Sequence, residues 1–196
     1  MSAKRGGGKG SSRGRRRGGG LSGAIDVCVY YTAQDDPKKN TAVRMQKQGQ
    51  ARLVDDIKHV QRHSVLLNPF AKKAISAEDL PMMRKNGLVA LDCSWRQAED
   101  MFPLLQGEVR SRALPFLVAA SPAKFGTPFE LSTAEALAAA LYIAGEQRQA
   151  RRVLKCVPWA DTFWEVNAQP LADYAACATS SEVVAAQALF LKDEEE

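Results

Sequence analysis

The sequence contains no long uninterrupted apolar run, few cysteines and almost no histidine. A helix that crosses a bilayer needs about 20 consecutive apolar residues, so we expect no membrane span. No apolar run follows the basic residues at the N-terminus, which argues against a secretory signal peptide. The four cysteines have no Cys-x-x-Cys spacing, which argues against a zinc site or a redox dithiol and favours a reducing compartment. These absences predict a cytoplasmic protein, and the basic N-terminus leaves passage into the nucleus open.

The sequence also lacks the residues that metal sites and P-loop nucleotide sites usually need. The two histidines, His59 and His63, are four residues apart, but no third ligand accompanies them, so we expect no metal. The chain has Gly-Lys-Gly between Gly6 and Ser12, whereas a P-loop needs Gly-Lys followed directly by Ser or Thr after a strand. We therefore set aside a P-loop NTPase. The 196 residues are 45% hydrophobic, which is enough for a sizeable buried core.

Positive charge is concentrated at the N-terminus. Seven of the 27 basic residues lie in the first 20 positions, together with eight of the 14 glycines and no acid, which leaves 20 basic against 22 acidic residues in the rest. Such a composition cannot bury apolar surface, so we expect residues 1–22 to be a disordered arm. Its arginines would attach to RNA phosphates without sequence choice, and Arg15, Arg16 and Arg17 are the candidates. A tail that only improves solubility is the alternative.

Apolar runs of strand length alternate with helical patterns after residue 22. Strands are predicted at 25–32, 64–67, 88–91 and 116–120. Helices are predicted from about 76 to 87 and at 95–101, 132–145, 150–156, 171–178 and 181–191. Strands that alternate with helices imply an α/β fold, and ligands of such folds bind at the carboxyl ends of the strands.

Two motifs stand where such a site is expected. The first, from Leu91 to Trp95, reads Leu-Asp-Cys-Ser-Trp and ends a predicted strand. The second begins at Leu114 as Leu-Pro-Phe-Leu-Val-Ala-Ala-Ser-Pro and continues through Gly126 to Leu-Ser-Thr-Ala-Glu-Ala-Leu at 131–137. Within it, Ser132 and Glu135 form a capping-box pattern, which predicts the start of a helix. The two motifs together predict a ligand site at the ends of two strands.

These motifs resemble the aminocarboxypropyltransferases of small-subunit ribosomal RNA. Further matches extend the resemblance over about residues 24 to 188: Tyr30-Tyr31, the loop from Asp35 to Thr41, Ile75-Ser76 with Asp79, Trp159, Phe163, Glu165 to Asn167, and Tyr174. The resemblance implies transfer of the 3-amino-3-carboxypropyl group of S-adenosylmethionine (SAM), with release of methylthioadenosine. The implied acceptor is a hypermodified pseudouridine of 18S rRNA, modified on the pre-40S particle during ribosome biogenesis.

The resemblance also implies a division of the chain. Residues 23–87 would form a small N-terminal α/β part. Residues 88–192 would bind SAM in a half similar to the SPOUT methyltransferases, with a trefoil knot, and residues 193–196 would be a short acidic tail. Periodicity alone could not have predicted a knot, because knots are very rare in proteins.

The resemblance implies a role for particular side chains. Asp92 would be the catalytic residue, and would either orient SAM or take the proton from the attacking base nitrogen. A cap on a helix that begins at Trp95 is the other reading of Asp92 and Ser94. The residues implied to bind SAM are Thr41, Leu91, Ser94, Trp95, Leu114, Phe129 and Thr133. From the residues alone, Leu91 and Leu114 are better interpreted as ordinary core leucines.

Contacts with RNA phosphates are predicted at basic residues near the first loop. These residues are Lys38, Lys39, Arg44, Lys47 and Arg52. A second basic group comprises Lys72, Lys73, Arg84 and Lys85. Because the chain after the tail is nearly neutral, we expect it to rely on the shape of the ribosomal particle to select its target.

The sequence departs from the family pattern at three places. Ala160-Asp161 stand where the family usually has Gly-His, and Asn40 and Ala42 surround Thr41 where Cys and Gly are usual. Ser121 replaces the usual Asn before Pro122. None of these departures removes the motifs around Asp92 and Leu114, so transferase activity stays the favoured function. Two other functions stay open beside it: a SAM-dependent RNA methyltransferase, and an assembly factor of the small subunit without catalysis.

Overall fold

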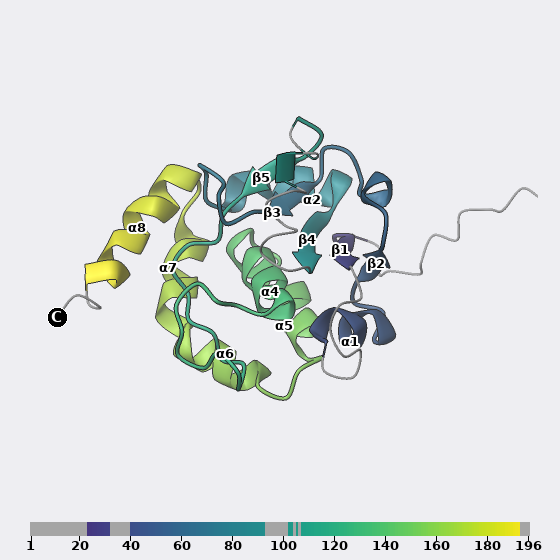
Figure 1. Ribbon diagram of the computed structural model, residues 1–196. Coiled ribbons are helices and arrows are strands. Elements are labelled where there is room, and N and C mark those ends of the chain that lie inside the picture. Colours follow the sequence, from purple (N-terminus) through teal and green to yellow (C-terminus); the bar gives the residue numbers. More distant parts are fainter. Residues whose placement is uncertain (1–22, 32–39, 93–101, 104, 106, 193–196) are drawn as a thin grey trace, which may run out of the picture.

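Five short strands form one parallel sheet in the order β2-β1-β4-β3-β5. The computed structural model describes residues 23–31, 40–92, 102–103, 105 and 107–192. The strands are β1 (Val27–Tyr31), β2 (Arg52–Val54), β3 (Val65–Leu67), β4 (Leu88–Asp92) and β5 (Arg110–Arg112). The central strand, β4, pairs with β1 and β3 (Figure 1). The predicted α/β class is confirmed.

Helices α1 (Thr41–Lys47), α2 (Leu80–Asn86) and α4 (Thr133–Ile143) contact strands of this sheet. α4 contacts β4, α1, α5 (Gln147–Leu154) and α7 (Ala168–Ala176), and it lies near the centre of the view in Figure 1. The remaining helical elements are α6 (Ala160–Val166), α8 (Ser180–Lys192) and the 3-10 turns η1 (Ile57–His59) and η2 (Ala77–Asp79). Over the described ranges, no helix combines the length and the apolar character that a bilayer crossing demands.

The predicted strand at 116–120 is wrong. This run is buried as expected, but it forms an irregular segment whose only bridge is the antiparallel pair Val118 and Pro128. Side chains replace the missing sheet partners: Asn167 bonds both the N–H and the C=O of Val118, and the Tyr174 hydroxyl donates to the carbonyl of Phe116. The other predicted strands are present as β1, β3 and β4, and the predicted helix at 95–101 lies outside the described residues.

The sheet takes strands from both parts of the predicted division. β1, β2 and β3 come from residues 23–87, and β4 and β5 come from residues 88–192. The larger apolar cluster also joins both, because it includes Val27 and Leu88 together with Leu137 and Phe163. The sheet and this core are therefore continuous across residues 87 and 88.

Successive residues of β4 belong to different faces of the sheet. Leu88 and Ala90 lie in the large cluster with α4, whereas Val89 and Leu91 pack with the smaller cluster on the other face. This alternation follows from the two-residue period of a strand. It places Asp92 on the face that carries α4.

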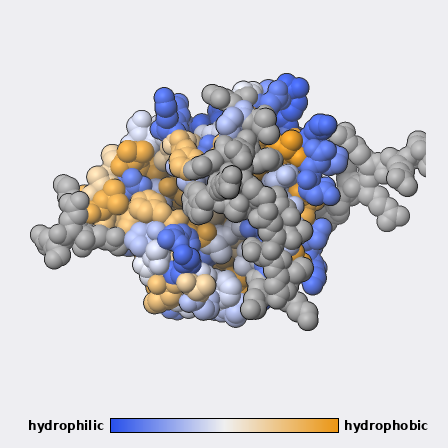
Figure 2. Space-filling view, viewed as in Figure 1, coloured by the Kyte–Doolittle hydropathy of each residue, from blue (hydrophilic) through white to orange (hydrophobic). Residues whose placement is uncertain are grey.

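The C-terminal helix α8 exposes apolar side chains. Val184, Leu189 and Leu191 are exposed, and Figure 2 shows an orange area on the side of the molecule where Figure 1 places α8. The opposite side of α8 is anchored by the buried Val183 and by the ring contact of Phe190 with Tyr174.

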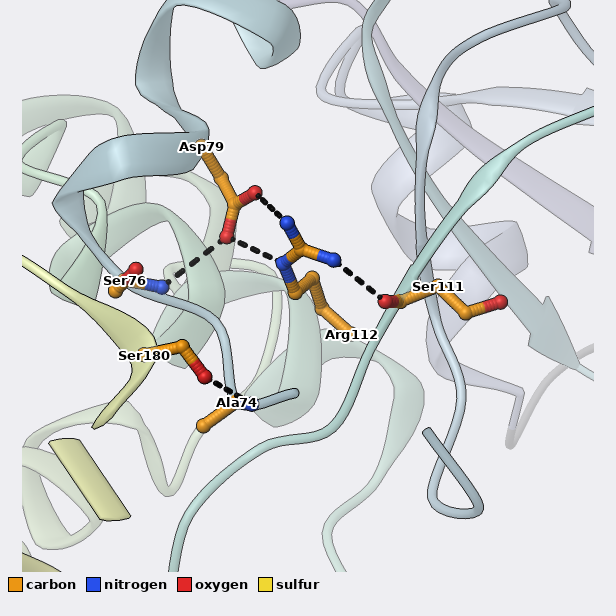
Figure 3. A network of polar contacts seen from close by, with 6 residues as sticks. All are labelled: Ala74, Ser76, Asp79, Ser111, Arg112 and Ser180. Carbon is orange, nitrogen blue, oxygen red and sulfur yellow. Dashed lines mark hydrogen bonds and ion pairs between the residues drawn. The ribbon is translucent and has the colours of Figure 1, made fainter. Parts of the chain in front are cut away.

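A buried ion pair joins the sheet to η2. The Arg112 Nε donates a hydrogen bond to Asp79 Oδ2 at 2.8 Å, Nη2 forms an ion pair with Oδ1 at 2.8 Å, and Nη1 donates to the Ser111 carbonyl (Figure 3). Asp79 is fully buried and also accepts the backbone N–H of Ser76 at 3.3 Å. Nearby, the Ser180 hydroxyl at the start of α8 accepts the N–H of Ala74 at 2.8 Å. The first contacts link β5 to η2, and the last links α8 to the segment before η2.

Two buried thiols make stability depend on pH. Burial raises the pKa of the Cys28 thiol from 9.0 to about 11, and it raises the pKa of Cys156 likewise. The unfolded thiols ionise near pH 9, so the stability tied to their neutral form is complete below that pH and is lost as the pH rises through about 11. We expect the free energy of unfolding in urea to fall above pH 9, and to fall less in a Cys28→Ala/Cys156→Ala variant. Equal slopes for both proteins would contradict this.

Candidate functional site

Asp92, at the carboxyl end of β4, is held by the starts of two helices. Its Oδ2 accepts a hydrogen bond from Asn40 Nδ2 at 2.8 Å, and its Oδ1 accepts one from the Thr133 hydroxyl at 3.1 Å. Asn40 precedes α1, and Thr133 is the first residue of α4. Both oxygens of one carboxylate are thus engaged by separate elements, which fixes its orientation.

Local sequence explains why these elements begin where they do. Asn40 is the N-cap of α1, because its Oδ1 accepts the N–H of Val43 at 3.1 Å. Ser132 and Glu135 form the predicted capping box at the start of α4. Before β4, Gly87 has φ +88, and a Cβ there would lie 2.7 Å from the carbonyl oxygen of Asp26. A glycine is therefore needed for the chain to enter β4 beside β1.

The apolar residues predicted to bind SAM lie on different faces. Leu91 packs with the smaller cluster, whereas Leu114 packs against the large cluster that contains α4. Phe129 is 56% exposed, and its ring meets Phe116 edge to face at a centroid distance of 5.6 Å. Thr41 is half-buried at the start of α1. The structure brings Thr41, Asp92 and Thr133 to one place and leaves Leu91 and Leu114 in separate clusters.

A hairpin from Leu117 to Phe129 leads into α4. Its backbone is closed by hydrogen bonds from the Phe129 N–H to the Leu117 carbonyl and from the Ala119 N–H to the Thr127 carbonyl. The buried Glu135 accepts the N–H of Ala120 at 2.9 Å while its other oxygen completes the capping box. Glu135 therefore has a structural role, which ties the hairpin to the first turn of α4.

The predicted RNA contacts are distributed over α1 and β2. Arg44 and Lys47 lie in the last turn of α1, about 6 and 10 Å from Asn40 along the helix axis. Arg52 lies in β2, 3.4 Å from the carboxylate of Asp26. The remaining residues predicted to bind RNA or SAM lie outside the described residues: Arg15, Arg16, Arg17, Lys38, Lys39, Ser94 and Trp95.

Several groups beside Asp92 fit a ligand such as SAM. Tyr31 pairs in register with Asp92, and its hydroxyl is buried without a hydrogen-bond partner among the described residues. The start of α4 offers N–H groups that suit a carboxylate. The described residues hold no group of three or more His, Cys, Asp or Glu side chains placed to share a metal ion. The site therefore has polar partners for an amino acid moiety.

The contact made by Asn40 could have been inferred only in part. An Asn directly before the start of a predicted helix is the usual pattern of an N-cap, so the hydrogen bond that its side-chain oxygen accepts from the helix was predictable. Its amide contact with Asp92 joins residues 52 positions apart, and no local pattern indicates it. Asn40, which stands where the family usually has Cys, thus supplies a hydrogen-bond donor to the Asp92 carboxylate.

Known proteins are similar to this chain over most of its length. A family model described as "Ribosome biogenesis protein, C-terminal" matches residues 65–191. The 16S rRNA aminocarboxypropyltransferase of Methanosarcina acetivorans is 42% identical over 168 residues, which is 85% of this chain and 95% of that protein. The enzyme of the same name from Methanocaldococcus jannaschii is 43% identical over 164 residues, 84% of this chain and 95% of that protein.

A solved structure is also similar over nearly the whole fold. The SAM-dependent rRNA acp-transferase Tsr3 from Vulcanisaeta distributa aligns with a TM-score of 0.75 and 36% sequence identity. The alignment covers 86% of this chain and 97% of that one. The likeness thus extends to both sides of residues 87 and 88.

Proposed function

This chain belongs to the family of small-subunit rRNA aminocarboxypropyltransferases, and from this premise we propose which residues carry the reaction and which RNA receives the group. The protein is a SAM-dependent transferase of ribosome biogenesis that acts on small-subunit rRNA. The acceptor that we propose is a hypermodified pseudouridine of 18S rRNA within the pre-40S particle. The archaeal relatives, which are named for the equivalent 16S rRNA, support this proposal.

The proposed chemistry is a substitution at carbon. A nitrogen of the base attacks the side-chain carbon next to the sulfonium of SAM, the carbon–sulfur bond breaks, and methylthioadenosine leaves. The nitrogen then loses its proton, which Asp92 is placed to accept. The observation that carries this assignment is the double hydrogen bond that Asn40 and Thr133 donate to the Asp92 carboxylate. A carboxylate held at both oxygens is aimed without further reorganisation.

The binding surface that we propose for SAM surrounds Asp92. Thr41 and Thr133 would bind polar atoms of SAM, while Leu91, Leu114 and Phe129 would contact its apolar parts with Ser94 and Trp95. The start of α4 supports this role, because its N–H groups suit a carboxylate. The proposal has four further parts. Residues 88–192 form a trefoil knot, and a boundary between the two parts of the chain lies near residue 87. The basic tail contacts RNA. The protein is located in the cytoplasm and can pass into the nucleus.

Labelled SAM tests the proposed reaction directly. Small subunits that lack the modification are incubated with the protein and SAM labelled either in its carboxyl group or in its methyl group. Carboxyl label in the RNA, with methylthioadenosine released, is the expected result. Methyl label with S-adenosylhomocysteine would make the protein a methyltransferase. No transfer and no SAM binding by calorimetry would favour an assembly factor.

Asn40→Asp separates the two roles of Asn40. An Asp caps a helix as well as an Asn does, so α1 should begin normally. The variant loses the amide donor to Asp92 and places a second carboxylate beside it. Because a hydrogen bond to a charged group contributes about 1.5–3 kcal/mol, we expect kcat to fall about tenfold or more. The measurement is kcat and KM, with the melting temperature recorded in parallel.

Asn40→Ser provides the matched control for charge. Serine also caps helices, but it brings no second negative charge to Asp92. Its loss of activity should therefore be smaller than that of Asn40→Asp, at a similar melting temperature. Wild-type kcat in both variants would show that the Asn40 amide does not position Asp92.

A further inference from the structure

Two neighbouring hollows lie along the edge strand β5. Their volumes are about 590 and 380 Å³, and Val109 lines both of them. The larger is lined by Asn68, Phe70, Ala71, Phe102, Pro103, Gly107, Val109 and Ser111, and the smaller by His63, Met82, Lys85, Asn86, Val109 and Arg110. None of the residues predicted to bind SAM lines either hollow. We call the two hollows together the β5 groove.

The smaller hollow is basic. Lys85 comes from the end of α2 and Arg110 begins β5, and both side chains are exposed. Within the described part of the chain, neither has an ion pair or a side-chain hydrogen bond. The neighbouring cations differ: Arg62 lies 2.7 Å from Glu108, and Arg84 lies 2.6 Å from Glu146. Positive charge without a partner is therefore concentrated at the hollow.

His63 is held beside these cations in an unusual conformation. Its φ is 62°, a left-handed value that residues other than glycine rarely adopt. Two hydrogen bonds fix it there: its N–H donates to the Glu108 carbonyl at 2.5 Å, and its own carbonyl accepts Asn86 Nδ2 at 3.1 Å. The backbone of His63 is thus tied both to the segment before β5 and to the end of α2.

The larger hollow carries an exposed aromatic ring. Phe70 is 59% exposed and meets Phe102 edge to face at a centroid distance of 6.0 Å. It follows the carboxyl end of β3, and Leu66 of β3 pairs with Val89 of β4. Since the strands are parallel, Phe70 lies toward the same edge of the sheet as Asp92. The β5 groove therefore runs from a basic end to an aromatic end on the side of the candidate site.

We propose that the β5 groove binds a single-stranded segment of the rRNA substrate, with phosphates at Lys85 and Arg110 and a base stacked on Phe70. This inference rests on the proposed function, which makes RNA the substrate. Lysine and arginine attach RNA through its phosphates, and an exposed ring stacks only on a base that is unpaired. In Figure 2 hydrophilic side chains gather at the upper margin, where Figure 1 places β5 and α2.

Binding of a short oligouridylate, measured by fluorescence anisotropy at several salt concentrations, tests the phosphate contacts. The Lys85→Gln/Arg110→Gln variant should bind more weakly, and its salt slope should fall by about 0.7 for each phosphate that the variant no longer neutralises. Arg62→Gln/Lys124→Gln removes two exposed cations that are already paired, with Glu108 and Glu130, and should bind like the wild type. If both double variants bound the oligouridylate equally weakly, the loss would be explained by net charge alone, and the proposal would be overturned.

The stacking interaction has its own matched pair. Phe70→Ala should weaken oligouridylate binding about 5- to 150-fold, and Phe70→Tyr should retain it. Phe125→Ala removes a ring that is equally exposed, at 62%, on the hairpin before α4, and should have little effect. Wild-type affinity in Phe70→Ala would overturn the proposal.

SAM binding and transfer separate this inference from the proposed function. No variant in the groove touches Asp92 or Thr133, so SAM affinity by calorimetry should stay unchanged, and saturating rRNA should restore kcat. Failure of the wild type to transfer the group would contradict the proposed function. Normal transfer with unchanged RNA affinity in every groove variant would contradict the groove alone.

Discussion

Replacing Asp92 by Asn is expected to lower transfer to rRNA about 100- to 10,000-fold, the range that a positioned proton acceptor contributes. Asparagine has the shape of aspartate but cannot take a proton from the base nitrogen. It can still accept a hydrogen bond from the Thr133 hydroxyl, so the start of α4 should keep its place. The measurement is kcat with labelled SAM and saturating rRNA, together with SAM affinity by calorimetry.

Asp161→Asn is the control for this prediction. Asp161 is an exposed carboxylate in the first turn of α6, and its loss should leave kcat unchanged. Asp92→Asn with normal kcat and a lower melting temperature would show that Asp92 serves the structure, by joining Asn40 to Thr133. The Asp92 carboxylate would then hold the starts of α1 and α4 together and would take no part in the reaction.

Replacing Asp79 by Ala is expected to cost about 3–5 kcal/mol of unfolding free energy, because it leaves the Arg112 guanidinium buried without its partner. Arg112 is only 6% exposed, so water cannot replace the two oxygens that it loses. The same change removes the acceptor of the Ser76 N–H. Urea unfolding at neutral pH measures the loss.

Removing both charges provides the control for the ion pair. An Asp79→Leu/Arg112→Met variant has no uncompensated charge, and replacing a buried pair by apolar residues is often neutral. We expect it to recover most of the stability that Asp79→Ala loses. A loss below about 1 kcal/mol in Asp79→Ala would mean that Arg112 finds water or another acceptor.

The elements that the sequence predicted well are those with strong local signals. Ser132 and Glu135 indicated the start of α4, and the apolar residues of β1 and β4 indicated buried strands. β2 and β5 escaped prediction because they are three residues long and carry Arg52, Arg110 and Arg112. The run at 116–120 was wrongly predicted as a strand, because its apolar residues are typical of one. It is apolar enough for a central strand, but Asn167 and Tyr174, some 50 residues later, satisfy its backbone.

The candidate site was predictable in its residue types and not in its contacts. Asp92 and Thr133 were selected through a family resemblance, since neither has a distinctive local pattern. Their hydrogen bond spans 41 positions, and the bond from Asn40 spans 52. Such contacts depend on how helices are placed against the sheet, which no window of sequence reports. The β5 groove depends on the same long-range placement.

The position of β4 between β1 and β3 sets an order for synthesis on the ribosome. The first three strands emerge before β4, yet β1 and β3 are not neighbours in the sheet. Residues 23–87 by themselves therefore contain the neighbours β1 and β2 and a separate β3, and lack the strand that lies between β1 and β3. Residues 88–92 close that gap, and with them Asp92 reaches the end of the sheet beside Asn40. The same five residues thus join β1 to β3 and supply the carboxylate of the candidate site, whereas β5 and the Thr133 contact come from later parts of the chain.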